Sequence, residues 1–500
     1  MGILVPGDTS WRIETADRVA FLIDTQAYFS AVRSALRQAK RSVTLLGWGF
    51  DPRTRLAPDG QEGHDEPDEI GQVLIDISRA RPDLDIRVLI WKSALPISAS
   101  QAFFPHSAHR LFENTPIRFL LDASVPYGAC HHQKVLVIDD AVAFCGGGDL
   151  CVDRWDSTRH LDVEPRRVMP DHDYHPARHD VFVVVDGAAA KALGELARER
   201  WFRATGERMP KLGPAELDPW PKGLAPHLSS TRVGIGRTEP AWHGRPLVQE
   251  IRHLSLESIY SAKKLIYLEN QYFASPVAVE AIAERLAEPD GPEVILVSTG
   301  SSPSWFDRLS MDRARSNMLE RLRAADLFDR FRALYPTTED GSPIIVHSKV
   351  TVIDDDLVRI GSANLNNRSG GFDTECELAF ESNSTADQLA FGAFRDRAIG
   401  HFLGVSGDRV TKARGQLGAM IPALESQNAK NRLRRIEPMK LTPFGQFIAA
   451  THLGDPVEVA DSWHPGRRQK RLYQQTRALG EGGMFRPRNW TLPLTPRQKS

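Results

Sequence analysis

Two copies of one short pattern hold the residues of this chain that are best suited to acid–base and nucleophilic chemistry. The pattern is His-x-Lys-x4-Asp, and its copies are His132, Lys134 and Asp139, and His347, Lys349 and Asp354. An imidazole can attack as a nucleophile or exchange a proton near neutral pH, and a lysine supplies a positive charge. One such pattern alone would carry little weight because short motifs recur by chance. Two copies in register make chance a poor explanation.

The register extends beyond the pattern. After six intervening residues, each aspartate is followed by a turn of small residues, at 146–149 and at 361–364. We expect these turns to bind the phosphate of a substrate through Gly147, Asp149, Ser362 and Asn364.

This set of residues fits the cleavage of a phosphodiester without a cofactor or a metal. The two lysines would neutralise the negative charge that otherwise repels an attacking group. One imidazole would attack phosphorus to give a phosphohistidine, and the other would protonate the leaving alcohol and then activate the incoming one. A carboxylate beside each ring would fix its tautomer, and Asp180 and Glu375 stand at matched positions for this task.

The aspartates of the pattern, Asp139 and Asp354, belong to the catalytic signature, but their place at a strand end favours another role. Each comes directly after an apolar stretch and lies within a run of aspartates. Carboxylates at such turns usually accept hydrogen bonds from backbone amides. We therefore expect both to hold their turns.

The elements that position these residues are also duplicated. Each half offers, in the same order, a strand, a second strand, the His-Lys-Asp strand, a further strand and a helix. The expected pairs are 43–50 and 265–273, 86–91 and 294–298, 135–138 and 350–353, 181–185 and 378–380, and the helices 188–202 and 386–402. Strands that alternate with helices favour an α/β fold. We predict two α/β/α sandwich halves about a pseudo-twofold axis, with one shared active site.

The expected domain boundaries follow from the repeat. The first half covers residues 1–205, a linker rich in Pro and Gly covers 206–230, the second half covers 231–410, and a basic extension covers 411–500. Because the duplication supplies both copies of the site, we expect the catalytic unit to be a monomer.

The chain resembles the phospholipase D superfamily, whose members share a duplicated His-Lys-Asp signature. The second copy matches the family pattern from His347 through Arg368-Ser369 to Glu375, and the stretches 131–156 and 268–273 resemble its lipid-hydrolysing branch. Arg178 departs from the pattern, since many relatives have Trp there. The resemblance implies a phosphohistidine mechanism in which His132 is the nucleophile and His347 the general acid and base.

Composition is that of an ordinary globular protein, with 41% hydrophobic and 25% charged residues among 500. No apolar run is long enough for a transmembrane helix, and the first fifteen residues do not resemble a secretory signal. The four cysteines lack Cys-x-x-Cys spacing, so reduced thiols are expected. We expect a cytoplasmic protein, peripheral to the membrane at most. His and Asp residues crowd 171–180, but we expect a solvated loop there and no metal.

Charge is uneven along the chain. Residues 428–500 hold fourteen Lys/Arg and five Asp/Glu, which gives +9 against a net charge of -1 for the whole. Such a tail either packs against the domain or contacts anionic lipid.

Four alternatives compete. The favoured one is a phospholipase D that converts a glycerophospholipid at a membrane surface to phosphatidate, with water or a primary alcohol as acceptor. A phosphatidyl-transferring phospholipid synthase would use the same intermediate. A nucleic-acid phosphodiesterase would place basic residues around the site, whereas here they gather in the tail. A scaffold without activity would have lost a His or Lys of the pattern.

Overall fold

A computed structural model describes residues 2–58, 68–93, 105–213, 218–439, 442 and 454–456. The first half contains the following elements: β1 (Arg12–Ile23), α1 (Thr25–Gln38), β2 (Ser42–Gly47), α2 (Ile70–Ala80), β3 (Asp85–Trp91), α4 (Pro105–Phe112), β4 (Arg118–Asp122), β5 (Val135–Ile138), β6 (Val142–Gly146), β7 (Arg178–His179), β8 (Val181–Asp186) and α5 (Gly187–Thr205).

The second half repeats this order with small additions. It contains β9 (Leu228–Glu239), β10 (Val248–Gln249), α6 (Glu250–Ser261), β11 (Leu265–Asn270), α7 (Pro276–Ala287), β12 (Glu293–Val297), α8 (Trp305–Ala325), β13 (Phe331–Pro336), β14 (Ile345–Val346), β15 (Lys349–Ile353), β16 (Leu357–Gly361), β17 (Glu375–Glu381), α9 (Thr385–Leu403), α10 (Gly407–Leu417), α11 (Met420–Gln427) and β18 (Leu433–Arg435).

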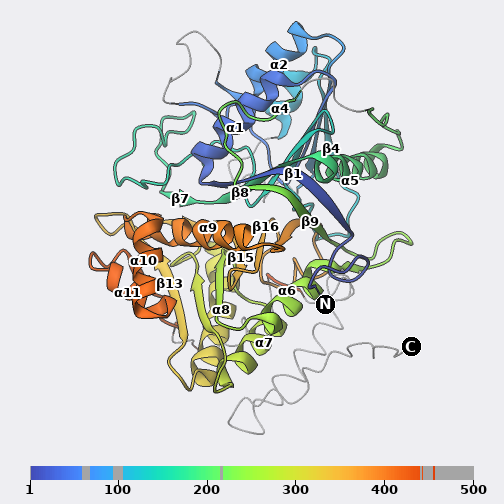
Figure 1. Cartoon of the computed structure of the whole chain (residues 1–500). Helices are drawn as coiled ribbons and strands as arrows, with labels where there is room; N and C mark the ends of the chain where they lie inside the picture. Colours follow the sequence, from blue (N-terminus) through green and yellow to red (C-terminus); the bar gives the residue numbers. More distant parts are fainter. Residues whose placement is uncertain are drawn as a thin grey trace, which may run out of the picture.

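One continuous sheet runs through both halves (Figure 1). Its strand order is β18-β13-β12-β11-β15-β16-β17-β9-β1-β8-β6-β5-β2-β3-β4. Outward from the central β9–β1 pair, β17-β16-β15-β11-β12-β13 on one side corresponds strand by strand to β8-β6-β5-β2-β3-β4 on the other. In each half, the outer strands β2-β3-β4 and β11-β12-β13 run parallel and the inner ones antiparallel. The predicted α/β fold with two homologous halves is confirmed.

Helices cover both faces of the sheet in each half. The helices α5 and α9 share one hydrophobic core with strands of both halves, which includes the fully buried Trp201 and Phe402. A second core joins α1, α2 and α4 to the first half, and a third joins α6, α7 and α8 to the second. The core between α5 and α9 therefore fixes the halves to each other.

Local sequence explains why these elements begin and end where they do. The strand β5 is a run of β-branched and leucine side chains that are all buried, as is usual for a strand covered on both faces. In α9, the hydroxyl of Ser384 caps the first turn by accepting from Asp387 N, and Gly404 ends the helix at φ 70°. Helix α8 occupies Trp305–Ala325.

The region between the halves and the C-terminal region differ from our expectation in detail. The strand β9 begins at Leu228, within the range expected to be linker. Within the expected extension, β18 pairs with β13 through Leu433 and Pro336, so that its first part belongs to the second half. The basic residues Arg467, Arg468, Lys470 and Arg471 lie outside the described residues.

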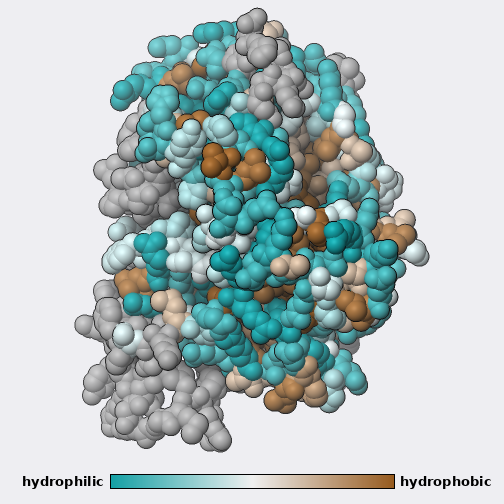
Figure 2. All heavy atoms as spheres, turned by 90° about the vertical axis from the view of Figure 1, so that its left-hand side faces the viewer, coloured by the Kyte–Doolittle hydropathy of each residue, from teal (hydrophilic) through white to brown (hydrophobic). Residues whose placement is uncertain are grey.

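The surface in Figure 2 is mainly hydrophilic, and its hydrophobic groups are small and separated. Among the residues that the structure describes, no helix combines the length and apolar character needed to span a bilayer. The four cysteines are buried and form no disulfide.

Candidate active site

The first histidine of the duplicated pattern lies just before β5 and faces the second half. His132 Nδ1 lies 3.0 Å from Oε2 of Glu375, the first residue of β17. Glu375 is completely buried, and its carboxylate accepts hydrogen bonds from the hydroxyls of Ser362 and Ser369, the latter at 2.6 Å. The carboxylate is thus held in place by two donors and orients the ring.

The second histidine lies between β14 and β15 and faces the first half. His347 Nδ1 lies 2.8 Å from Asp180 Oδ2. The short strands β7 and β14 pair beside it, and the amide of His347 donates to the carbonyl of His179 at 2.8 Å. The backbone of one half therefore positions the imidazole of the other.

The two histidine–carboxylate pairs are crossed between the halves. The two carboxylates occupy equivalent positions in the strand register. Gly146 is paired with Phe182, two residues after Asp180. Gly361 is paired with Glu377, two residues after Glu375. The side chains of His132 and His347 are 17% and 10% exposed, whereas both carboxylates are at 0%. Each ring therefore has one fixed nitrogen, and solvent reaches the ring.

The two lysines of the pattern are buried beside these rings. Lys134 Nζ lies 3.2 Å from Asp149 Oδ2 and donates to the carbonyl of His132 at 3.0 Å. Lys349 Nζ donates to Oε1 of Gln271 at 3.3 Å and to the carbonyl of His347. Each ammonium is therefore held next to the histidine of its own copy.

Burial and mutual repulsion disfavour positive charge at this site. Burial, with the charge of Lys134, lowers the pKa of Lys349 to about 7, and the opposing influence is the carboxylate of Asp180. Burial and the two lysines hold the pKa of His132 well below its usual value. His347 has its pKa lowered in the same way. An anion placed between these groups would relieve the repulsion, which is the behaviour expected of a phosphate-binding site.

The carboxylates respond to burial in the opposite direction. Burial raises the pKa of Glu375 to about 7, although the hydroxyls of Ser362 and Ser369 oppose the shift. Burial likewise raises the pKa of Asp180 to about 6, against the charge of Lys349. Both carboxyl groups therefore hold a proton more readily than exposed carboxyl groups do.

The aspartates of the pattern do not contact the histidines or the lysines. Asp139 accepts hydrogen bonds from the amides of Lys40, Arg41 and Ser42 at 2.7–2.8 Å. Asp354 makes the equivalent bonds, at 2.8–2.9 Å, with Lys263, Lys264 and Leu265. The donors are backbone amides, as we expected. They do not belong to the aspartates' own turns, because they lie at the starts of β2 and β11, about a hundred residues earlier in the chain. These aspartates thus fix neighbouring strands, and the geometry gives them no part in the chemistry.

Three of the four residues that we expected at the phosphate have other partners. The amide of Gly147 donates to the carbonyl of Val181 at 3.2 Å, and a side chain at this glycine would meet Asp180 Oδ1 at 2.2 Å. Asp149 pairs with Lys134 and accepts from the amides of Trp48 and Gly49. A carboxylate in this place repels a phosphate and acts by holding the lysine.

The other two of the four residues that we expected at the phosphate lie in the second turn of small residues, at 361–364. The hydroxyl of Ser362 donates to Glu375, which turns it toward the carboxylate. Asn364 is buried, and its Oδ1 has no hydrogen-bond partner among the described residues. A role for Asn364 in binding phosphate stays a prediction.

Two residues of the site had no assigned role in the sequence analysis. Gln271 contacts Lys349, and Ser369 donates to Glu375 and also accepts from the amide of Asn364 at 3.0 Å. Both lie in stretches that resemble the family, which is the only signal the sequence offers for them.

The residues at 171–180 separate into two groups. Asp171, His172 and Asp173 are exposed in a loop, whereas His179 and Asp180 are completely buried. The crowded segment therefore does not converge on one point.

The fold and the site define a bilobal α/β protein in which each half contributes one His–Lys pair and the carboxylate for the other half's histidine. Comparison with known proteins agrees with this description. Residues 256–391 match a family model described as "Cardiolipin synthase, PLD-like domain". The chain belongs to the phospholipase D superfamily.

Individual relatives carry several names. Phospholipase D A of Dictyostelium discoideum is 24% identical over 438 residues, which cover 74% of this chain and 33% of that protein. Cardiolipin synthase A of Pseudomonas putida is 28% identical over 419 residues, which cover 82% of this chain and 74% of that protein. The chain thus spans about a third of the phospholipase D and three quarters of the synthase.

A solved structure supports the fold. The phosphatidylserine synthase of Haemophilus influenzae aligns with a TM-score of 0.54 and 13% identity, over 93% of this chain and 94% of that one. At this level of identity the similarity concerns the fold alone.

Proposed function

We propose that this protein is a phospholipase D-type enzyme that cleaves the headgroup from a glycerophospholipid and passes the phosphatidyl group to water or to an alcohol. The observation that carries the proposal is the crossed pair of imidazoles. Each has Nδ1 fixed by a buried carboxylate, and among the described residues Nε2 of neither ring has a hydrogen-bond partner. The names of the relatives supply the class of substrate.

The first step forms a phosphohistidine. His132 Nε2 attacks phosphorus, the bond from phosphorus to the headgroup oxygen breaks, and a proton on His347 Nε2 passes to that oxygen. The negative charge of the bound phosphate restores the protonated form of His347, which the free site disfavours. Lys134 and Lys349 neutralise the charge on the nonbridging oxygens.

The second step reverses the roles. His347, now neutral, takes a proton from water or an alcohol, whose oxygen attacks phosphorus and releases His132. The product is phosphatidate when the acceptor is water and a phosphatidyl alcohol when it is an alcohol. One covalent intermediate therefore accounts for both hydrolysis and transfer.

The assignment of His132 as the nucleophile rests on the resemblance to the family. The geometry of the two pairs is nearly symmetric, and the two carboxylates differ by one methylene group. Their hydrogen bonds also differ, since two hydroxyls hold Glu375 and a backbone amide holds Asp180.

The test uses pure protein with mixed phospholipid vesicles, a primary alcohol and no added metal. We expect phosphatidate and the phosphatidyl alcohol from the wild type and neither from His132→Asn. A denatured sample quenched during turnover should carry the phosphatidyl group on His132. Repeating the assay with glycerol and with serine as acceptors separates a hydrolase from a phospholipid synthase. Cleavage of DNA or RNA oligonucleotides with no lipid product would refute the proposal.

Contact of the tail with anionic lipid, a cytoplasmic location and a monomeric catalytic unit stay predictions. The first is measured by sedimentation with vesicles that contain increasing amounts of anionic lipid. We expect binding to weaken as salt rises, since each basic residue near such a surface contributes about 1 kcal/mol.

A further inference from the structure

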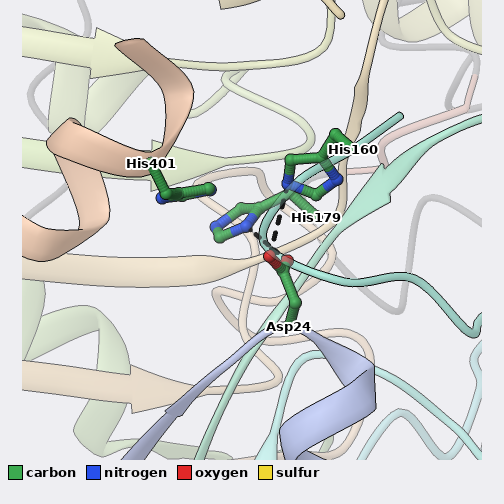
Figure 3. Close-up of side chains that lie close together, drawn as sticks. All are labelled: Asp24, His160, His179 and His401. Carbon is green, nitrogen blue, oxygen red and sulfur yellow. Dashed lines mark hydrogen bonds and ion pairs between the residues drawn. The ribbon is translucent and has the colours of Figure 1, made fainter. Parts of the chain in front are cut away.

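A second cluster of ionisable side chains lies where the two halves meet, and three of its four members are buried. Its members are Asp24, His160, His179 and His401, and each offers one atom such that all four atoms lie within 4.8 Å of one another. Asp24 directly precedes α1, His160 lies between β6 and β7, His179 lies in β7, and His401 lies in α9 of the second half (Figure 3). The proposed catalytic steps use none of these side chains.

Hydrogen bonds fix which nitrogen of each ring faces the centre of the cluster. His160 Nδ1 lies 2.9 Å from Asp156 Oδ2, so Nε2 is the nitrogen that faces Asp24, 3.3 Å from its Oδ2. His179 Nε2 lies 2.8 Å from Glu269 Oε2, so Nδ1 faces Asp24, 2.7 Å from its Oδ1. In Figure 3 both rings point toward this carboxylate.

This arrangement is characteristic of histidines that bind metal ions. A ligating imidazole usually donates its other N–H to a carboxylate, which fixes the tautomer and makes the ligand nitrogen more basic. Asp156 and Glu269 occupy this outer position for His160 and His179, and both are completely buried. An ordinary ion pair needs one carboxylate for each histidine. Here each of the two rings faces Asp24 on one side and an outer carboxylate on the other.

Several atoms that face the cluster lack a hydrogen bond. Asp24 Oδ2, His160 Nε2 and both ring nitrogens of His401 are buried and have no hydrogen-bond partner among the described residues. The 3.3 Å separation of Oδ2 and Nε2 is that of an ion pair, but its angles do not make a hydrogen bond. Buried polar atoms without partners are costly, and a bound cation would satisfy Asp24 Oδ2, His160 Nε2 and one of the two nitrogens of His401.

The charge of the surroundings also suits a cation. Three carboxylates, of Asp24, Asp156 and Glu269, are within hydrogen-bond distance of His160 or His179. Arg167 is 3.3 Å from Asp156, but it faces the outer side of the cluster through the carbonyls of Leu161 and Asp162. Asp156 thus pairs with Arg167 on its outer side, whereas the carboxylates of Asp24 and Glu269 face the histidine rings.

We propose that Asp24, His160, His179 and His401 bind one divalent transition-metal ion, with zinc as the best match. Three imidazole nitrogens and one carboxylate oxygen form a tetrahedral donor set of the kind that zinc accepts. Ligands at about 2.0–2.1 Å from zinc lie roughly 3.3–3.5 Å apart. Because no two of the four atoms are more than 4.8 Å apart, any pair reaches this spacing with side-chain shifts of at most about 1.5 Å in total.

The proposed ion would be structural and would join the two halves, because His401 comes from the second half and the other ligands from the first. It would also stiffen β7. The carbonyl of His179 accepts from the amide of His347, and the next residue, Asp180, holds the ring of His347. The ion would thus stabilise the support of the catalytic histidine without contacting the substrate.

The experiment measures metal content directly and does not depend on enzymatic activity. Wild-type protein is stripped with a chelator, incubated with Zn²⁺ alone, dialysed against metal-free buffer and measured by mass spectrometry of the element. We expect one zinc per chain and a rise in the melting temperature. In parallel, Co²⁺ should give the intense visible bands of a four-coordinate site.

Two variants make the assignment specific. His401→Gln removes one ligand and should lose most of the bound zinc, whereas His253→Gln alters a half-exposed histidine that pairs with Asp8 at the surface and should keep it. Less than a tenth of an equivalent of zinc in the wild type would overturn the proposal and leave protonated histidines as the balancing charge. Equal zinc in His401→Gln and the wild type would also overturn it. If His401→Gln does not fold, the stoichiometry and Co²⁺ spectrum of the wild type decide the question.

Discussion

Replacing Glu375 by glutamine separates the chemistry of the site from its stability. The carboxylate accepts hydrogen bonds from His132, Ser362 and Ser369, and it is completely buried. Glutamine keeps the shape but removes the negative charge and one acceptor oxygen. The nucleophile would then lose the group that holds its tautomer and stabilises its positive charge as phosphorus is attacked.

The expected loss can be worked from these contacts. A hydrogen bond to a charged group contributes about 1.5–3 kcal/mol and one between neutral groups about 0.5–1.5, so the loss of charge removes about 1–1.5 kcal/mol. The three donors also face one acceptor oxygen too few, which adds about 1–3 kcal/mol. The transition state should thus lose about 2–4.5 kcal/mol, which corresponds to a fall in kcat of roughly 30- to 2,000-fold.

The stabilities of the wild type and of Glu375→Gln should depend differently on pH. Burial raises the pKa of Glu375 from 4.5 to about 7, so the folded protein binds this proton more tightly than the unfolded chain does. The stabilisation from the protonated form is therefore lost as pH rises from about 4.5 to 7, and at pH 8 the wild type carries an unfavourable buried charge. Glutamine is neutral at every pH, so this pH-dependent loss is absent from the variant, and its free energy of unfolding relative to the wild type should be higher at pH 8 than at pH 4.5.

The assay compares kcat with denaturant unfolding at pH 8 for three proteins: the wild type, Glu375→Gln and Glu377→Gln. Glu377 is a matched control because it is a buried glutamate on the same strand, but its carboxylate pairs with Arg359 at 2.9 Å. Its replacement should lower stability and leave the kcat of the folded protein within about threefold. Wild-type kcat in Glu375→Gln, or an equal loss of kcat in the two folded variants, would refute the role assigned to the Glu375 carboxylate.

Three further predictions concern the supporting residues. Asp139→Ala should lower the free energy of unfolding by about 3–5 kcal/mol, because three backbone amides lose an ionised acceptor. Asp139→Asn should lower it by less. Denaturant titration measures both changes. Plotted against pH, kcat/KM should fall above pH 7 as Lys349, whose pKa burial lowers to about 7, loses its charge. In Asp180→Asn this fall in kcat/KM should occur at lower pH, because the carboxylate that raises the pKa of Lys349 is gone. A fall at the same pH as in the wild type would exclude Lys349 as its cause. Gly147→Ala should lower kcat at least tenfold, because the new methyl group meets Asp180 and the carbonyl of His347. Gly213→Ala should not, because a methyl group there meets no atom of the described residues within 4 Å.

The duplicated elements could be predicted from the sequence because their signals are local. The apolar stretches after Lys134 and Lys349 read as strands, and β5 and β15 occupy them. The strands that join the halves were harder to find. Neither β1 nor β9 is marked by a repeated motif, although their pairing makes the sheet continuous.

The contacts across the halves were beyond the sequence. Asp180 and Glu375 could be named as partners for the histidines, but their exchange between halves depends on how two folded units pack. The same holds for Asp24 and His401, which are far apart in the chain and stand in no shared pattern. Spacing along a chain reports neighbours within an element, and packing of distant elements needs the fold.

The crossed carboxylates have a consequence for how the gene can change. Asp180 and Glu375 are equivalent positions of the two repeats, yet one side chain is longer by a methylene group and each serves the histidine of the opposite repeat. If one repeat were copied over the other by recombination, a carboxylate of the wrong length would face a histidine. Selection should therefore preserve the difference between the repeats. The two halves of the gene should remain different from each other and change in a coordinated way.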